Sequence, residues 1–134
     1  MRALLLALLL TACGAGPLAP TSTVWGLHYR AVIVPPGALD PMDGRTYLGR
    51  IEIEADHLSP FMLGHELGHL WLKSNVQAQA ICAVQPASHC NDAEAFADAL
   101  GMAVWRAGCG LGDLAWPGGE VTGCQLPNPS AVHP

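Results

Sequence analysis

The chain has 134 residues, of which 51% are hydrophobic and only 13% are charged. This length allows one domain and excludes an enzyme with a separate cofactor domain, while the composition favours a packed fold over disorder. The formal net charge is −5, from 6 Lys and Arg against 11 Asp and Glu. A chain without an excess of basic residues lacks the charge that nucleic-acid binding requires, so we expect no nucleic-acid partner.

The first segment, MRALLLALLLTAC, has the features of a secretory signal. A single Arg precedes the apolar run Ala3–Leu10, and small residues follow it. The run is too short to cross a bilayer, which takes about 20 residues. Leu10-Thr11-Ala12-Cys13 resembles the bacterial lipobox, which implies cleavage after residue 12 and acylation of Cys13. We expect an exported protein attached to the bacterial cell envelope by a lipid at Cys13; an ordinary signal peptide cut nearby is the alternative.

The next residues predict a tether and then a short sheet. Residues 13–23 are mostly small, include two prolines and show no hydrophobic period, so we expect a flexible tether before a single domain over residues 24–134. Val24–Val34 is rich in β-branched and aromatic residues and predicts a strand. Within Thr46–Ala55, the stretch Arg50–Ala55 alternates charged and apolar residues, which predicts a half-exposed or edge strand.

A first helix is predicted directly after these strands. Ser59 is a good N-cap and Pro60 is favoured at the first helical position, so the helix should run from there to about Lys73 or Ser74. Leucines at helical spacing predict its buried face: Leu63, Leu67 and Leu70.

A second long helix is predicted from about Asp92 to Ala107. Gly108 suits the position that ends a helix, and residues 110–134 have the composition of a loop and tail. Strands followed by helices indicate an α+β fold.

Four cysteines remain after the leader: Cys82, Cys90, Cys109 and Cys124. An even number in an exported chain indicates two disulfides, for which three connectivities are possible. We favour pairing between sequence neighbours, Cys82 with Cys90 and Cys109 with Cys124, although the sequence does not decide the connectivity. A metal site made of cysteines is less attractive because no two of them are spaced Cys-x-x-Cys.

The first predicted helix contains His65-Glu66-Leu67-Gly68-His69, the pattern His-Glu-x-x-His. Positions i and i+4 share one helix face, about 6 Å apart along the axis, so the two imidazoles can bind one Zn²⁺. Glu66 lies about 100° around the helix and can reach a water on the metal. Zinc lowers the pKa of that water, and a carboxylate can take its proton as general base. The motif therefore predicts His65 and His69 as zinc ligands and Glu66 as the catalytic residue.

A catalytic zinc needs a third protein ligand. A pattern that continues the motif with a Gly and a third His fails, because Leu72 and Asn75 stand at those positions. Glu94 and Asp98, one helical turn apart on the second predicted helix, offer carboxylates instead.

Gluzincins, the thermolysin-like metallopeptidases, carry such a Glu-x-x-x-Asp after their His-Glu-x-x-His helix, and residues 60–107 resemble them. The resemblance implies that His65, His69 and Glu94 bind zinc. It implies that Asp98 accepts a hydrogen bond from the far nitrogen of a ligand histidine, which we expect to be His65. It also implies a small zincin-like domain, with a short N-terminal sheet followed by the active-site helix and the Glu-bearing helix.

Some observations leave alternatives open. Glu94 stands at the spacing of a capping box from Asn91, and could bond back to the backbone there. Thermolysin-like enzymes have an Asn just before the ligand Glu, where this chain has Ala93, and a Tyr or His further on that stabilises the oxyanion. Both tyrosines here, Tyr29 and Tyr47, precede the motif, so no residue is assigned that role.

The resemblance implies a zinc metallopeptidase that cleaves a peptide or protein substrate. We expect the substrate to pair with the Arg50–Ala55 edge strand by β-augmentation. Cell-wall peptide or another amide is an alternative substrate. The alternative from another class is a zinc-stabilised, non-catalytic binding module at the cell surface, although such a module would not need Glu66.

Overall fold

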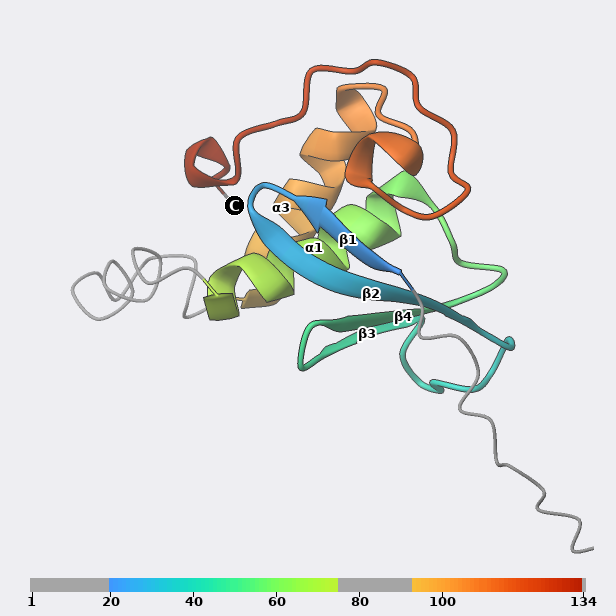
Figure 1. Cartoon of the computed structure of the whole chain (residues 1–134). Helices are drawn as coiled ribbons and strands as arrows, with labels where there is room; N and C mark the ends of the chain where they lie inside the picture. The colour runs from blue at the N-terminus through green and yellow to red at the C-terminus, as the bar shows by residue number, and fades with distance from the viewer. Residues whose placement is uncertain (1–19, 75–92, 134) are drawn as a thin grey trace, which may run out of the picture.

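The computed structural model describes residues 20–74 and 93–133, and Figure 1 shows their path. A four-stranded mixed sheet has the order β1-β2-β4-β3, in which β2 and β4 are parallel and the other neighbours are antiparallel. The strands are β1 (Thr21–Val24), β2 (Leu27–Val34), β3 (Gly44–Tyr47) and β4 (Arg50–Glu54). The helices are α1 (Pro60–Ser74) and α3 (Ala93–Arg106), followed by the short 3-10 helices η1 (Gly112–Leu114) and η2 (Pro129–Ala131). The predicted α+β class is confirmed.

Several expectations fall on residues that the structure does not describe. They concern the leader, the lipidated Cys13 and most of the tether, the pair Cys82 and Cys90, and the cap at Asn91. Strand β1 begins at Thr21, so residues 21–23, predicted as part of the tether, belong to the sheet.

Each of the two long strands predicted from the sequence is instead a hairpin. The β1–β2 turn is Trp25-Gly26 and the β3–β4 turn is Leu48-Gly49, and all four residues have positive φ angles between 48° and 73°. Two central residues with positive φ are the feature of a type I′ turn, whose twist matches that of antiparallel strands.

The prediction that Arg50–Ala55 is an edge strand is wrong. Strand β4 lies between β2 and β3, and its two glutamates are buried. Glu52 pairs with Arg45 and Arg50, while both oxygens of Glu54 accept backbone N–H groups from the loop that follows β2. Its charges therefore have protein partners, and the edge of the sheet near α1 is β3.

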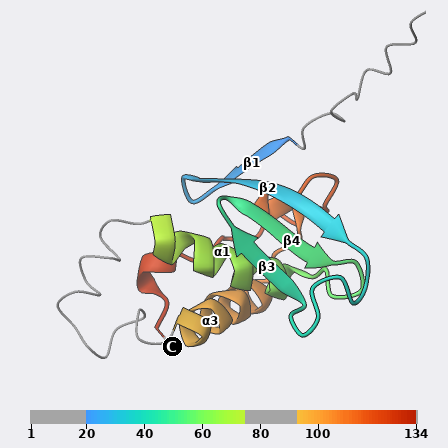
Figure 2. The ribbon, with the colours of Figure 1, turned by 90° about the horizontal axis from the view of Figure 1, so that it is seen from below.

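Helix α1 lies between the sheet and α3, as Figure 2 shows. Ser59 caps α1 by accepting a hydrogen bond from the backbone N–H of Met62 at 3.1 Å, and the helix ends at Ser74, as predicted. The leucines of its predicted inner face are all buried. The hydrophobic core lies between this face, the inner side of the sheet and α3.

Helices α1 and α3 pack against each other at glycines. Gly64 faces Gly101 and Gly68 faces Ala97, and this reversed order of contacts shows that the two helices run antiparallel. A Cβ atom at Gly68 would lie 2.9 Å from the Cα of Ala97, so the backbones touch here. This close approach brings the first turns of α3 against the motif helix.

The C-terminal residues are fixed to the domain by a disulfide and by hydrogen bonds to Asp113. Cys109 is bonded to Cys124, which confirms the predicted pairing of these two. Asp113 accepts hydrogen bonds from the hydroxyl and the backbone N–H of Thr122, and also from the backbone N–H groups of Gly110 and Gly123. These bonds, above all the one from the Thr122 hydroxyl, hold the pKa of its carboxyl well below the usual range. No helix in the described ranges is long and apolar enough to cross a membrane.

Candidate metal centre

The two histidines of the motif point the same way from α1. Their rings lie one helical turn apart with centroids separated by 4.8 Å, and the two Nε2 atoms are 3.1 Å apart. Both side chains are mostly shielded from solvent, at 14% and 16% exposure. Two ring nitrogens this close to each other can bind one cation between them when both offer their lone pairs.

Glu94 reaches the same point from the first turn of α3. Its Oε1 is 3.1 Å from His69 Nε2 and its Oε2 is 3.4 Å from His65 Nε2. Ligands bonded to a tetrahedral zinc at about 2.0–2.1 Å stand about 3.3 Å from one another. The separation of the two Nε2 atoms, 3.1 Å, and those to the nearer Glu94 oxygens, 3.1 and 3.4 Å, are close to that figure, so these side chains are suited to hold zinc.

Asp98 lies one turn further along α3 and contacts the other side of His65. Its Oδ1 is 2.8 Å from His65 Nδ1, and since a carboxylate can only accept, Nδ1 is the donor. A proton on Nδ1 leaves the lone pair of a neutral ring on Nε2, the atom that faces Glu94. The structure thus brings Asp98 to the histidine for which the sequence predicts it.

Burial lowers the pKa of His69 below its ordinary value, although the charge of Glu94 acts in the opposite direction. A lowered pKa keeps the ring neutral at neutral pH, and only a neutral imidazole offers a lone pair to a metal.

Glu66 occupies a different place from the three candidate ligands. Its side chain is buried, with 4% of the residue exposed, and it points toward β3. The hydroxyl of Thr46 donates to Glu66 Oε2 at 2.6 Å. Gly44 stands against the same carboxylate, because a Cβ atom there would lie 2.7 Å from Oε1. Sequence reasoning missed Thr46 and Gly44, and no local pattern marks them, since they meet Glu66 only when the sheet and helix pack.

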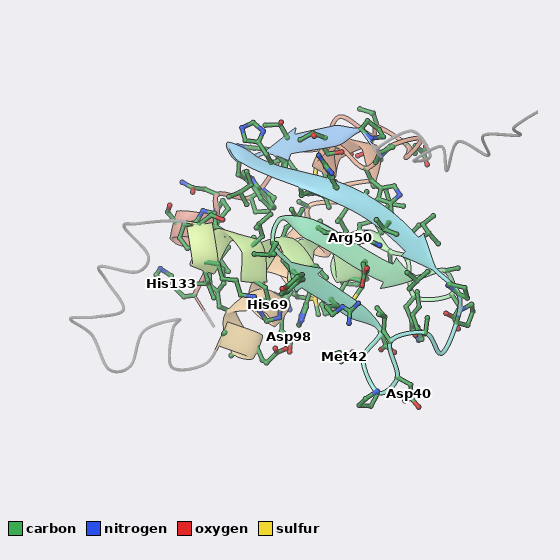
Figure 3. The ribbon with its side chains drawn as sticks, turned by 60° about the horizontal axis from the view of Figure 1, so that its bottom comes forward. Asp40, Met42, Arg50, His69, Asp98 and His133 are labelled. Atoms are coloured by element: carbon green, nitrogen blue, oxygen red, sulfur yellow. A yellow bond between two sulfur atoms is a disulfide. The ribbon has the colours of Figure 1, made fainter. Side chains whose placement is uncertain are left out.

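A cleft of about 470 Å³ opens over these side chains. Its floor is one face of α1 and its wall is β3 with the preceding loop, and Figure 3 shows His69 and Asp98 close together with Met42 on that loop. The lining residues are Pro41, Met42, Asp43, Gly44, Arg45, Thr46, Met62, His65, Glu66, His69, Lys73 and Glu94. Neither Tyr29 nor Tyr47 is among these lining residues.

The loop that forms this wall is anchored by Glu54. Its Oε1 accepts the N–H of Leu39 at 2.7 Å and its Oε2 that of Gly37 at 2.9 Å. These two bonds hold the pKa of Glu54 below its usual value of 4.5, and the bond from Leu39 has the larger effect. Glu54 therefore stays ionised at neutral pH and fixes the loop against β4.

Comparison with known proteins gives no assignment for this site: no family model matches the chain, and neither does any curated protein or solved structure. A function must therefore be argued from the arrangement of the residues themselves.

Proposed function

We propose that this protein is a zinc-dependent metallopeptidase of gluzincin type, with His65, His69 and Glu94 as metal ligands and Glu66 as general base. The observation that carries the proposal is the meeting of His65 Nε2, His69 Nε2 and the Glu94 carboxylate, whose two oxygens lie 3.4 and 3.1 Å from these nitrogens, in a cleft that a buried carboxylate also lines. A zinc ion held there would supply Lewis-acid chemistry, polarising a carbonyl and lowering the pKa of water.

In this proposal Glu66 moves one proton twice. Its carboxylate takes a proton from the attacking water, so that an O–H bond of the water breaks and one forms on the carboxylate. The water oxygen bonds to the carbonyl carbon and the C–N bond breaks, while Glu66 gives its proton to the nitrogen of the leaving amine and returns to its ionised form. A carboxylate that is mostly buried but lines the cleft suits this exchange, because it meets water and substrate only from the side of the cleft.

The substrate strand is proposed to pair with β3 instead of β4. Asp43 accepts a backbone hydrogen bond from Glu54 at 3.0 Å, and hydrogen-bonded residues alternate along an antiparallel pair. By that alternation the backbone N–H and C=O groups of Gly44 and Thr46 point away from β4, toward the free edge. An extended peptide added there would lie along the cleft beside the candidate ligands, which is the arrangement that β-augmentation requires.

The decisive experiment compares wild type with Glu66→Gln for zinc content and for cleavage of a peptide library. The variant should keep its zinc and lose hydrolysis, while His65→Ala should lose the zinc. Glu120→Gln, at an exposed position outside the cleft, is the matched control and should behave as wild type. Undiminished cleavage by Glu66→Gln would defeat the mechanism. Zinc retention in a wild type that cleaves nothing would favour the alternative, a zinc-stabilised binding module.

Export and lipid attachment belong to the same proposal, because a cell-envelope peptidase would be held at the membrane through Cys13 and not through a spanning helix. Labelling of cells with a radioactive fatty acid should mark the wild-type chain and leave Cys13→Ser unmarked. Equal labelling of both would exclude lipidation at this residue.

A further inference from the structure

The carboxylate of Glu66 is held asymmetrically, and the asymmetry comes from β3. Oε2 accepts a hydrogen bond of 2.6 Å from the Thr46 hydroxyl, which also lies 3.0 Å from the backbone oxygen of Glu66. A short bond between a hydroxyl and a carboxylate is a strong one, because one partner is charged. The orientation of the Glu66 side chain is therefore set by a residue of the sheet and not by its own helix.

The other oxygen, Oε1, receives no hydrogen bond from the described residues. Among the described residues, Trp25 Nε1 is the one completely shielded side-chain nitrogen or oxygen without a hydrogen-bond partner, so Oε1, which has none, is not completely shielded. Its contact with solvent is in the cleft, which Glu66 lines. Gly44 leaves the space that Oε1 occupies, since a Cβ atom there would come within 2.7 Å of it.

We propose that Thr46 is a positioning residue that holds Oε2 of Glu66 and thereby makes Oε1 the oxygen that exchanges the proton. This inference rests on the proposed function. In the first transfer a water O–H bond breaks and an Oε1–H bond forms; in the second, Oε1–H breaks and an N–H bond forms on the leaving amine. Oε2 remains an acceptor throughout, so the hydrogen bond from Thr46 persists in both forms of the carboxyl group.

The kinetic test uses Thr46→Val, which keeps the branched shape of threonine and removes the hydroxyl. A misplaced general base should lower kcat by about 10- to 100-fold, with KM and zinc content unchanged. Thr46→Ser keeps the hydroxyl and should restore most of kcat. Thr23→Val is the matched control, because it also removes a hydrogen-bonded strand hydroxyl, one that contacts His28 outside the cleft. Wild-type kcat in Thr46→Val, or equal losses in the Ser and Val variants, would overturn the proposal.

A second measurement does not depend on activity. Crystal structures of the zinc-free wild type and both Thr46 variants should show the Glu66 carboxylate displaced in Thr46→Val and in place in Thr46→Ser. An unmoved carboxylate in Thr46→Val would overturn the proposal even if no peptide is cleaved. If the wild type binds zinc and cleaves nothing, the proposed function fails on its own, while the crystal structures still decide the role of Thr46. Should Thr46→Val fail to fold, Gly44→Ala provides the independent variant, since its Cβ atom should displace Oε1 and lower kcat with the hydroxyl intact.

Discussion

The contact between α1 and α3 decides whether Glu94 can reach the histidines, and Gly68→Ala tests it. The added Cβ atom would lie 2.9 Å from the Cα of Ala97, a backbone atom that no rotamer change can move. Carbon atoms in contact stand about 3.5–4.0 Å apart, so the helices must separate locally by roughly 0.6–1 Å.

The expected loss of stability is small and the expected loss of zinc is large. Alanine in place of glycine favours the helix by about 0.8–1.0 kcal/mol, while overpacking of a core contact costs about 1–3 kcal/mol, so unfolding should become easier by roughly 0–2 kcal/mol. Zinc sites tolerate ligand displacements of about 0.2 Å, well below the displacement of Glu94 that follows from the separated helices. We expect the zinc Kd of Gly68→Ala to rise by at least about tenfold.

Competition with a chromogenic chelator measures this Kd, and thermal unfolding measures stability alongside it. Tyr29→Phe is the control, because it removes the buried hydrogen bond from Tyr29 to the Leu114 carbonyl, outside the cleft. That loss should cost about 1–3 kcal/mol and leave the zinc Kd unchanged. Wild-type zinc binding by Gly68→Ala would refute the argument from helix spacing. Equal weakening in Tyr29→Phe would show that zinc affinity follows overall stability and not this contact.

Three further variants test the surroundings of the site. Asp98→Ala should weaken zinc binding about 10- to 100-fold in the same chelator assay, because it frees the ligand ring that Asp98 orients; an unchanged Kd would contradict that role. Glu54 has a lowered pKa, so its stabilisation is present above pH 4.5 and lost as the pH falls through the folded pKa. The melting-temperature difference between wild type and Glu54→Gln should accordingly shrink between pH 7 and pH 3, and a constant difference would argue against an ionised anchor. Replacing Cys109 and Cys124 by Ser opens a crosslink of sequence separation 15 and should lower the free energy of unfolding by about 3 kcal/mol in denaturant titrations, whereas wild-type stability would exclude this contribution.

Features encoded by residues close in sequence could be predicted. The bounds of α1 follow from the Ser59 cap and the leucine spacing, and those of α3 agree with the prediction to within one residue at each end. Gly108 ends α3 with φ of +70°, as a residue after a helix often does. These signals depend on local backbone geometry, so no knowledge of the tertiary fold was needed to read them.

The sheet was predicted less well, for two physical reasons. Its hairpin turns, Trp25-Gly26 and Leu48-Gly49, place a large apolar residue where Asn or Asp is usual, so neither turn carries the usual sequence signal of a hairpin. Strand β4 alternates charged and apolar residues as an edge strand would, yet Glu52 meets Arg45 of β3 and Glu54 meets backbone N–H groups of the loop after β2. Sequence alternation records which side chains are charged, and not whether solvent or protein satisfies them.

The candidate site depends both on local helical spacing and on contacts between residues that are distant in the sequence. His65, His69, Glu94 and Asp98 lie on two helices, and helical spacing alone could place each pair on one face. That the two faces meet depends on Gly68 and its partner helix, and how Glu66 is oriented depends on Thr46, a residue of the sheet. A His-Glu-x-x-His helix therefore supplies two candidate metal ligands and a carboxylate. The motif alone does not fix which oxygen of that carboxylate faces the cleft. In this chain Thr46 of β3 holds the Glu66 carboxylate, and β3 is also the strand that we propose receives the substrate. Under the proposed function, positioning of the base and binding of the peptide are therefore coupled through one short edge strand.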